Sequence, residues 1–223
     1  MNVDGEVRRI RFHDYHEIYT VPGLYEQLFY DELKCDSPRT IAGLLGEQLD
    51  DTSAADLRVL DVGAGNGMVG EELDRMGAKH IVGVDIIEEA AEAAQRDRPG
   101  IYDDYVVVDL TDVPPATHAE LSEHRFNCLT TVAALGFGDI PPEAFTEAYN
   151  LVEDGGLIAF NIKEKFVEDG DRSGFEELIS QSLENGTMDL QAERRYRHRL
   201  SVAGDPLYYM AMVARKRADI ADS

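Results

Sequence analysis

A turn rich in glycine follows an apolar segment that ends in an acid. In the stretch VLDVGAGNGMVGEEL, Asp61 closes the apolar run, and Gly63, Gly65 and Gly67 stand at alternate positions before a helical pattern begins. A glycine turn between a strand and a helix commonly binds a nucleotide-like ligand at the carboxyl end of the strand. The dinucleotide fingerprint needs the spacing G-x-G-x-x-G, and Met68 stands where its third glycine would be. No lysine followed by serine or threonine comes after the glycines, which disfavours a phosphate loop.

Two further acids recur at a constant distance along the chain. Asp85 and Asp109 follow Asp61 at intervals of 24 residues, each at or near the end of a predicted strand. Because the carboxyl ends of parallel strands share one sheet edge, the three carboxylates are expected along that edge. They would repel a pyrophosphate. They suit a ligand with cationic groups, ribose hydroxyls and an amino-bearing ring, and S-adenosylmethionine has all of these. The alternative is that each aspartate only caps a helix or a turn.

Strand-like and helical segments alternate over most of the chain. We expect strands at 57–62, 80–86, 104–110, 126–135 and 155–163, and helices at 67–77, 88–97, 141–152 and 174–185. This alternation predicts an α/β fold with a doubly wound, mostly parallel sheet. Two extended runs, 188–202 and 205–217, are joined by the turn-like AGDP and are expected to pair antiparallel at one end of the sheet. The prediction is a seven-stranded sheet with an antiparallel last strand.

The first 50 residues carry helical patterns at 22–33 and 39–49. Ser37 is expected to cap the second helix, with Pro38 just inside it. We expect these helices to cover the ligand edge. The predicted organisation is a helical covering segment at 1–50, the main domain at 51–217 and a polar tail at 218–223.

Composition narrows the setting of the protein. A chain of 223 residues, 43% hydrophobic, can bury one full core. It contains no apolar run long enough to span a bilayer, and its first residues lack a signal-peptide core. The cysteines Cys35 and Cys128 lie far apart, so we expect reduced thiols, no metal site and a cytoplasmic location.

The charge balance is strongly acidic, with a formal net charge of -23. Such a field disfavours nucleic-acid binding. The basic run RRYRHR at 194–199 is the alternative for a nucleic-acid patch, although its alternation is typical of a strand. Arginines outnumber lysines by 16 to 5, which suits a salt-adapted or high-GC source and equally an ordinary acidic cytosolic protein.

The motifs together resemble those of the class I S-adenosylmethionine-dependent methyltransferases. VLDVGAGNG resembles motif I of that family, and the acids of IVGVD and VVVDL match its next two motifs. LVEDGGLIAF resembles the turn into the fifth strand, with Glu153 and Asp154 replacing the usual proline context. The resemblance extends roughly over residues 24–215. Within the family, GMVGEEL and AALGFGDIPPEAF resemble the small methyltransferases of the Williams–Beuren-region type.

The resemblance implies that S-adenosylmethionine is the cofactor and S-adenosylhomocysteine its product. The residues that it implies as cofactor contacts are Asp61, Gly63 and Gly65 at the methionine part, Asp85 at the ribose hydroxyls, Ile86, Asp109 and Leu110 at the adenine, Thr131 and Val132 at the methyl end, and Tyr30 as an aromatic that closes over the cofactor. Gly67 would allow close packing of the following helix. For Tyr30, a core position on an amphipathic helix is the alternative.

Methyl transfer from a sulfonium is an in-line displacement that needs positioning and exclusion of water. A general base is needed only if the acceptor must lose a proton. His13 and His16 are candidates, but solvated or packed histidines are favoured there, and the other histidines are expected away from the site or at the surface. Lys163 and Glu164 could contact the acceptor, although a solvated strand end is favoured. The pattern identifies no catalytic residue.

The predicted function is methylation of a small, neutral or cationic molecule on oxygen, nitrogen or sulfur, by a monomer or homodimer that binds neither nucleic acid nor membrane. Protein methylation is one alternative, and a non-catalytic regulator that binds the cofactor is another. A dinucleotide-dependent oxidoreductase is disfavoured by Met68 and by the lack of a Tyr-x-x-x-Lys pair.

Overall fold

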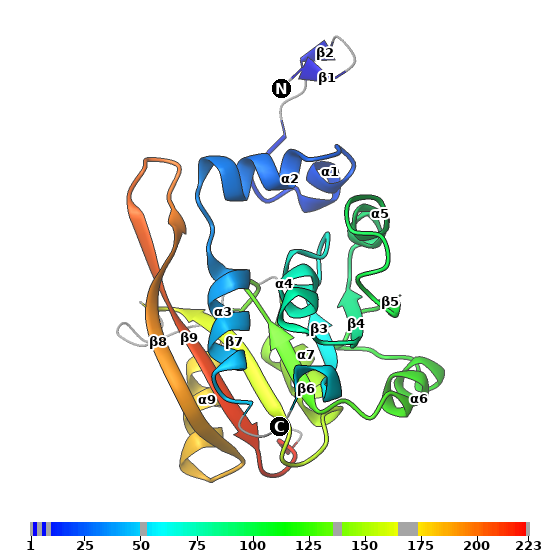
Figure 1. The fold of residues 1–223 in the computed structure, drawn as a ribbon, viewed down its shortest axis with the longest axis vertical. Helices are drawn as coiled ribbons and strands as arrows, with labels where there is room; N and C mark the ends of the chain where they lie inside the picture. The colour runs from blue at the N-terminus through cyan, green and yellow to red at the C-terminus, as the bar shows by residue number, and fades with distance from the viewer. Residues whose placement is uncertain are drawn as a thin grey trace.

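A seven-stranded sheet forms the centre of the computed structural model, which describes residues 2–3, 6–7, 10–49, 53–135, 140–164 and 174–221. The strands follow the order β5-β4-β3-β6-β7-β9-β8 across the sheet (Figure 1). Their bounds are Arg58–Val62 (β3), His80–Asp85 (β4), Asp104–Val107 (β5), Cys128–Thr131 (β6), Leu157–Lys163 (β7), Met188–Leu200 (β8) and Pro206–Lys216 (β9). Neighbouring strands from β5 to β7 pair parallel, and β9 pairs antiparallel with both β7 and β8. The predicted sheet, with its antiparallel last strand, is confirmed.

Helices lie against the sheet and over its ligand edge. They are α1 (Tyr15–Tyr19), α2 (Leu24–Glu26), the π-helical turn η1 (Gln27–Glu32), α3 (Ser37–Gly46), the 3-10 turn η2 (Ala54–Asp56), α4 (Met68–Met76), α5 (Glu88–Asp97), α6 (Pro115–Glu123), α7 (Pro142–Asn150) and α9 (Phe175–Glu184). The short strands β1 (Asn2–Val3) and β2 (Glu6–Val7) pair with each other. Among the helices described, none combines the length and apolar character that crossing a bilayer requires.

Two hydrophobic clusters fill the two faces of the sheet. On one face, side chains of α6, α7 and α9 pack against β3, β4, β6 and β7 in a cluster that includes Leu121, Phe145 and Phe160. On the other face, α3 and α4 pack through residues such as Leu45 and Leu73. Strands covered on both faces are mostly apolar, and β3 is buried from Val59 to Val62, with Asp61 as a buried polar residue among them.

Only part of the first 50 residues lies over the ligand edge. The segment 10–35, with α1, α2 and η1, forms its own cluster around Ile18, Leu24 and Phe29, and Figure 1 shows α1 and α2 above the sheet next to α5. By contrast, α3 belongs to the core on one face of the sheet. We therefore propose that the covering segment comprises residues 10–35 and that the main domain begins with α3.

The prediction that Ser37 caps α3 is wrong. Asp36 stands at the N-cap, and Ser37 is the first helical residue. Its buried hydroxyl instead contacts Tyr196 Oη and His198 Nδ1, both at 2.6 Å. His198 was expected at the surface but is 5% exposed, because β8 turns this side chain toward α3. Burial and the nearby Arg199 charge lower the pKa of His198 to about 3, so the imidazole is neutral.

Candidate cofactor site

The glycine turn leaves β3 with three residues in the left-handed region of backbone conformation. The φ angles are 70° at Gly63, 55° at Gly65 and 89° at Gly67, values that favour glycine. A Cβ on Gly65 would lie 2.6 Å from Tyr19 Oη. A Cβ on Gly63 would lie 3.2 Å from both Ala134 Cβ and Ile140 Cδ1. Glycine is therefore favoured at Gly63 and Gly65 both by the backbone conformation and by the close neighbours that a side chain would meet.

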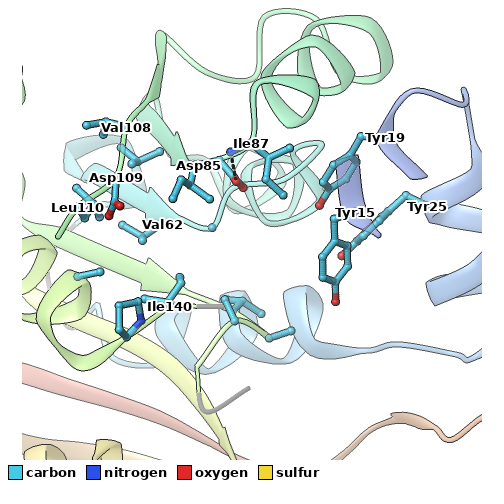
Figure 2. A pocket seen from close by; sticks show the side chains of 18 residues that line it. Tyr15, Tyr19, Tyr25, Val62, Asp85, Ile87, Val108, Asp109, Leu110 and Ile140 are labelled. Atoms are coloured by element: carbon cyan, nitrogen blue, oxygen red, sulfur yellow. Dashed lines mark hydrogen bonds between the residues drawn. The ribbon is translucent and has the colours of Figure 1, made fainter. Parts of the chain in front are cut away.

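A pocket of about 920 Å³, open solvent at its mouth included, lies at the carboxyl ends of β3, β4, β5 and β6. Figure 2 shows Asp109 and Leu110 at one end of it and the side chains of Tyr15, Tyr19 and Tyr25 at the other. The carboxyl ends of parallel strands are the usual place of a ligand site in an α/β sheet. The pocket is thus bounded by the sheet edge below and by the covering segment on one side.

Asp85 lines the centre of the pocket with a carboxylate held in one orientation. Its Oδ2 accepts a hydrogen bond from the Gly65 N–H at 2.9 Å. Its Oδ1 accepts one from the Ile87 N–H at 3.0 Å, which Figure 2 shows as a dashed line. A carboxylate accepts hydrogen bonds only, so this group suits a ligand that offers hydroxyl donors. The neighbouring Ile86 also lines the pocket and is 60% exposed.

Asp61 lies behind the glycine turn and is not among the residues that line the pocket. It is 1% exposed and accepts hydrogen bonds from Thr130 Oγ1 at 2.7 Å and Tyr102 Oη at 2.8 Å. Burial raises the pKa of Asp61 to about 7, against the opposing effect of these two hydrogen bonds. This carboxyl group supports the turn from within the core.

Asp109 lines the pocket but uses one carboxylate oxygen locally. Its Oδ1 accepts hydrogen bonds from the Thr111 N–H at 2.9 Å and from Thr111 Oγ1 at 2.7 Å. These bonds lower the pKa of Asp109, whose side chain is exposed. Asp109 therefore stabilises a turn, which was the alternative considered from the sequence, and it also lines the pocket. Leu110, which follows it, is 6% exposed and also lines the pocket.

The tyrosines at the pocket are not the one that the sequence indicated. Tyr30 packs in the cluster of the covering segment and does not line the pocket. Tyr15 and Tyr19 from α1 and Tyr25 from α2 do, and their rings stack, with centroids 6.3 Å apart between Tyr15 and Tyr19 and 5.1 Å between Tyr19 and Tyr25. The spacing of four between Tyr15 and Tyr19, which places both on one helix face, was the available signal.

The segment after β6 forms the opposite wall. Val132, Ala133 and Ala134 line the pocket there. Thr131 is fully buried just before them, and its hydroxyl has no hydrogen-bond partner among the described residues. Ala133 has a φ of 61°, and its N–H donates a hydrogen bond to Asn161 Oδ1 at 2.7 Å. Sequence reasoning missed Ala133, Ala134 and Asn161.

The remaining candidates lie outside this pocket. His13 and His16 are exposed, and neither they nor Lys163 line it. Glu164 pairs with Arg195 on β8. Within the described parts of the chain, no group of acidic, histidine or cysteine side chains is arranged to hold a metal ion.

Comparison with known proteins shows which family part of the chain matches. Residues 60–160 match the methyltransferase domain family. The chain is 30% identical over 107 residues to a ubiquinone biosynthesis O-methyltransferase of Neisseria meningitidis, covering 47% of this chain and 43% of that protein. It is 28% identical over 109 residues to the Nitrosococcus oceani protein of the same name, covering 49% and 44%. The chain thus spans less than half the length of these curated relatives.

Solved structures share the fold. A Clostridium acetobutylicum S-adenosylmethionine-dependent methyltransferase aligns with a TM-score of 0.58 at 12% identity, covering 87% of this chain and 97% of that one. Magnesium protoporphyrin IX methyltransferase from Synechocystis, crystallised with bound S-adenosylmethionine, aligns with a TM-score of 0.55 at 15% identity, covering 80% and 79%. The Williams–Beuren-region type stays a prediction, and part of its motif, 136–139, lies outside the described residues.

Proposed function

We propose that this chain, which belongs to the class I S-adenosylmethionine-dependent methyltransferases, transfers the methyl group of that cofactor to a small-molecule acceptor. The observation that carries the proposal is the pocket at the sheet edge, bounded by the glycine turn and centred on the oriented carboxylate of Asp85. S-adenosylmethionine brings the methyl group together with its leaving group, so the protein supplies binding, orientation and exclusion of water.

The residues present fit this cofactor. A side chain at Gly63 would project against Ala134 and Ile140, so glycine keeps that part of the pocket open beside the turn. Asp85 lines the pocket with a carboxylate that two backbone N–H groups orient, and a carboxylate is a suitable acceptor for ribose hydroxyls. We propose that Ile86, Asp109 and Leu110 hold the adenine at their end of the pocket.

At the other end, we propose that Gly63 and Val132, which line the pocket, border the methionine part. Gly65 and Thr131 do not line the pocket; Gly65 lies in the same turn, against Tyr19, and Thr131 is buried just before Val132. The buried place of Asp61 supports an indirect role, in which it fixes the turn and does not contact the cofactor. We propose that Tyr15 and Tyr19 of α1 and Tyr25 of α2, in place of Tyr30, close over the cofactor.

The acceptor enters, in this proposal, between two walls of different chemistry. Tyr15, Tyr19 and Tyr25 present aromatic rings, and the wall formed by residues 132–134 is apolar. Aromatic faces stack on flat rings and attract cations, and the carboxylates of Asp85 and Asp109 add negative charge. These features support a neutral or cationic acceptor, methylated on oxygen, nitrogen or sulfur. The names of the curated relatives support a small organic molecule.

We further propose a cytoplasmic protein, monomeric or homodimeric, that acts without nucleic acid. The formal net charge of -23 supports the last of these statements, since nucleic-acid binding depends on cationic neutralisation of phosphates.

Two measurements test the function in sequence. Calorimetry with S-adenosylmethionine, S-adenosylhomocysteine and NAD⁺ should show binding of the first two only, and tight binding of NAD⁺ alone would refute the cofactor assignment. Methyl-labelled cofactor is then incubated with fractionated metabolite pools and, separately, with protein extracts. Label in a small molecule supports the proposal. Label confined to protein supports protein methylation, and binding without transfer supports a regulator.

A further inference from the structure

We propose that Asn161, on β7, is a positioning residue for the pocket wall formed by residues 132–134. Its side chain lies outside the pocket, yet it holds Ala133 in a backbone conformation that alanine disfavours. The inference rests on the proposed cofactor site, because this wall flanks the place assigned to the methionine part.

The wall depends on a strained residue. Ala133 has a φ of 61°, in the left-handed region, where an L side chain crowds its own backbone. Its N–H donates to Asn161 Oδ1 at 2.7 Å. Such a conformation persists only where surrounding structure enforces it, and it is concentrated at functional sites. We infer that the hydrogen bond from the Ala133 N–H to Asn161 Oδ1 holds Ala133 in this conformation.

Asn161 can satisfy Ala133 in one orientation only. Its Nδ2 contacts Tyr196 Oη at 2.5 Å and Ser37 Oγ at 3.2 Å, and the side chain is fully buried. The two hydroxyls can accept from Nδ2, which leaves Oδ1 to face the Ala133 N–H. With the amide reversed, its NH₂ group would face the N–H of Ala133, donor against donor. The hydroxyl groups of Ser37 and Tyr196 therefore fix the orientation of the Asn161 amide, and the amide holds the backbone of Ala133 in the wall.

The hydroxyls are themselves held in place by other elements. Ser37 is the first residue of α3, and its Oγ lies 2.6 Å from both Tyr196 Oη and His198 Nδ1. Because His198 is neutral, its Nδ1 can accept the Ser37 proton while Tyr196 donates to Ser37. One consistent chain of hydrogen bonds thus connects α3 and β8, through Asn161 of β7, to the wall.

The wall also touches the glycine turn. A Cβ placed on Gly63 would meet Ala134 Cβ at 3.2 Å, so Ala134 stands directly against the turn. Release of Ala133 into an ordinary negative φ would redirect the following residue, Ala134. The opening beside Gly63 would change with it. Asn161 therefore sets the width of the pocket at the place assigned to the methionine part.

The test measures S-adenosylhomocysteine affinity by calorimetry, with a thermal melt of every variant. Asn161→Leu should weaken binding by about tenfold, the scale of one lost buried hydrogen bond. Adding Ala133→Gly to Asn161→Leu should restore most of the affinity, because glycine adopts the left-handed conformation without enforcement. The control is Asn127→Leu. Asn127 lies just before β6, away from the pocket, and its Oδ1 accepts a hydrogen bond from the Arg58 N–H at 2.8 Å. This variant should therefore lower the melting temperature and leave the affinity for S-adenosylhomocysteine unchanged.

Ala133→Val keeps the test decisive if Asn161→Leu does not fold. A β-branched residue resists positive φ, so this variant disturbs the wall while keeping the side chains of Asn161, Ser37 and Tyr196, and it too should weaken binding. Affinity within about twofold of wild type in folded Asn161→Leu or in Ala133→Val would overturn the proposal. So would failure of the Ala133→Gly rescue. If wild-type protein does not bind S-adenosylhomocysteine, the proposed function fails instead.

Discussion

Removal of the Asp85 carboxylate should separate cofactor binding from the support of the glycine turn. If Asp85 accepts the ribose hydroxyls, Asp85→Ala loses hydrogen bonds to a charged group, which contribute about 1.5–3 kcal/mol. That corresponds to roughly ten- to a hundredfold weaker binding of S-adenosylhomocysteine. Charge-assisted bonds of this kind are the strong ones.

The structure adds a second expected effect. The Asp85 carboxylate accepts the Gly65 and Ile87 N–H groups at 2.9 and 3.0 Å, so the alanine variant leaves both donors to water. We expect a loss of about 1–2 kcal/mol in the free energy of unfolding, since the site is half-buried and water can replace part of each bond. For a chain of this length that lowers the melting temperature by about 2–8 °C.

A matched variant isolates the binding effect. Asp103 Oδ2 accepts the Ile81 N–H at 3.3 Å, near the opposite end of β4, and Asp103 does not line the pocket. Asp103→Ala removes the same charge and a similar bond, so it should leave S-adenosylhomocysteine affinity unchanged. Calorimetry and thermal melts of both variants provide the comparison. If folded Asp85→Ala binds within about twofold of wild type, or if Asp103→Ala loses as much affinity, the ribose role of Asp85 is refuted.

Three further perturbations test the support of the turn. Because burial raises the folded-state pKa of Asp61 to about 7, folding takes up a proton there, so its contribution to stability should fall as pH rises from about 4 to 7. The difference in melting temperature between wild type and Asp61→Asn across that range should show this trend, and a flat difference would contradict it. Gly65→Ala should destabilise the fold and weaken cofactor binding more than Gly100→Ala, which has a φ of 80° but an open environment; equal effects would show that strain alone acts. Glu26→Ala should speed S-adenosylhomocysteine dissociation in stopped-flow measurements. Glu26 is the last residue of α2 in the covering segment, and its Oε1 accepts a hydrogen bond from Asn66 Nδ2 in the glycine turn at 2.7 Å, so the bond connects the two. An unchanged dissociation rate would show that this bond does not hold the covering segment over the cofactor.

The sheet and most helices were predictable because their signals are local. A parallel strand buried on both faces needs an unbroken apolar run, and an amphipathic helix needs a periodic one. The helix expected at 88–97 is α5 at Glu88–Asp97. By contrast, α6 went unpredicted because it offers little pattern: Leu121 is its one buried side chain. The π-helical turn η1 also lies inside what the sequence presents as one continuous helix at 22–33.

The three acids show what equal spacing can and cannot predict. Asp61 pairs in register with Gly83, and Asp85 pairs with Val107. Each acid along the chain therefore lies two residues further out along the strand direction than the one before. Asp61 remains inside the sheet against Tyr102, Asp85 reaches the pocket, and Asp109 lies beyond the last residue of β5. The spacing predicts a shared edge, but the strand register decides which carboxylate meets a ligand.

The wall after β6 depended on contacts that no local pattern carries. Alanine is an ordinary residue for a strand end, and nothing in TTVAAL indicates a positive φ at Ala133. The conformation becomes possible because Asn161, 28 positions later, meets the Ala133 N–H across the β6–β7 pair. Asn161 is oriented in turn by Ser37 and Tyr196, more than 30 positions away on either side. A glycine at position 133 would have indicated a positive φ in the sequence. Alanine adopts this conformation only with support from tertiary contacts, and for this reason the Ala133→Gly rescue tests the origin of the wall directly.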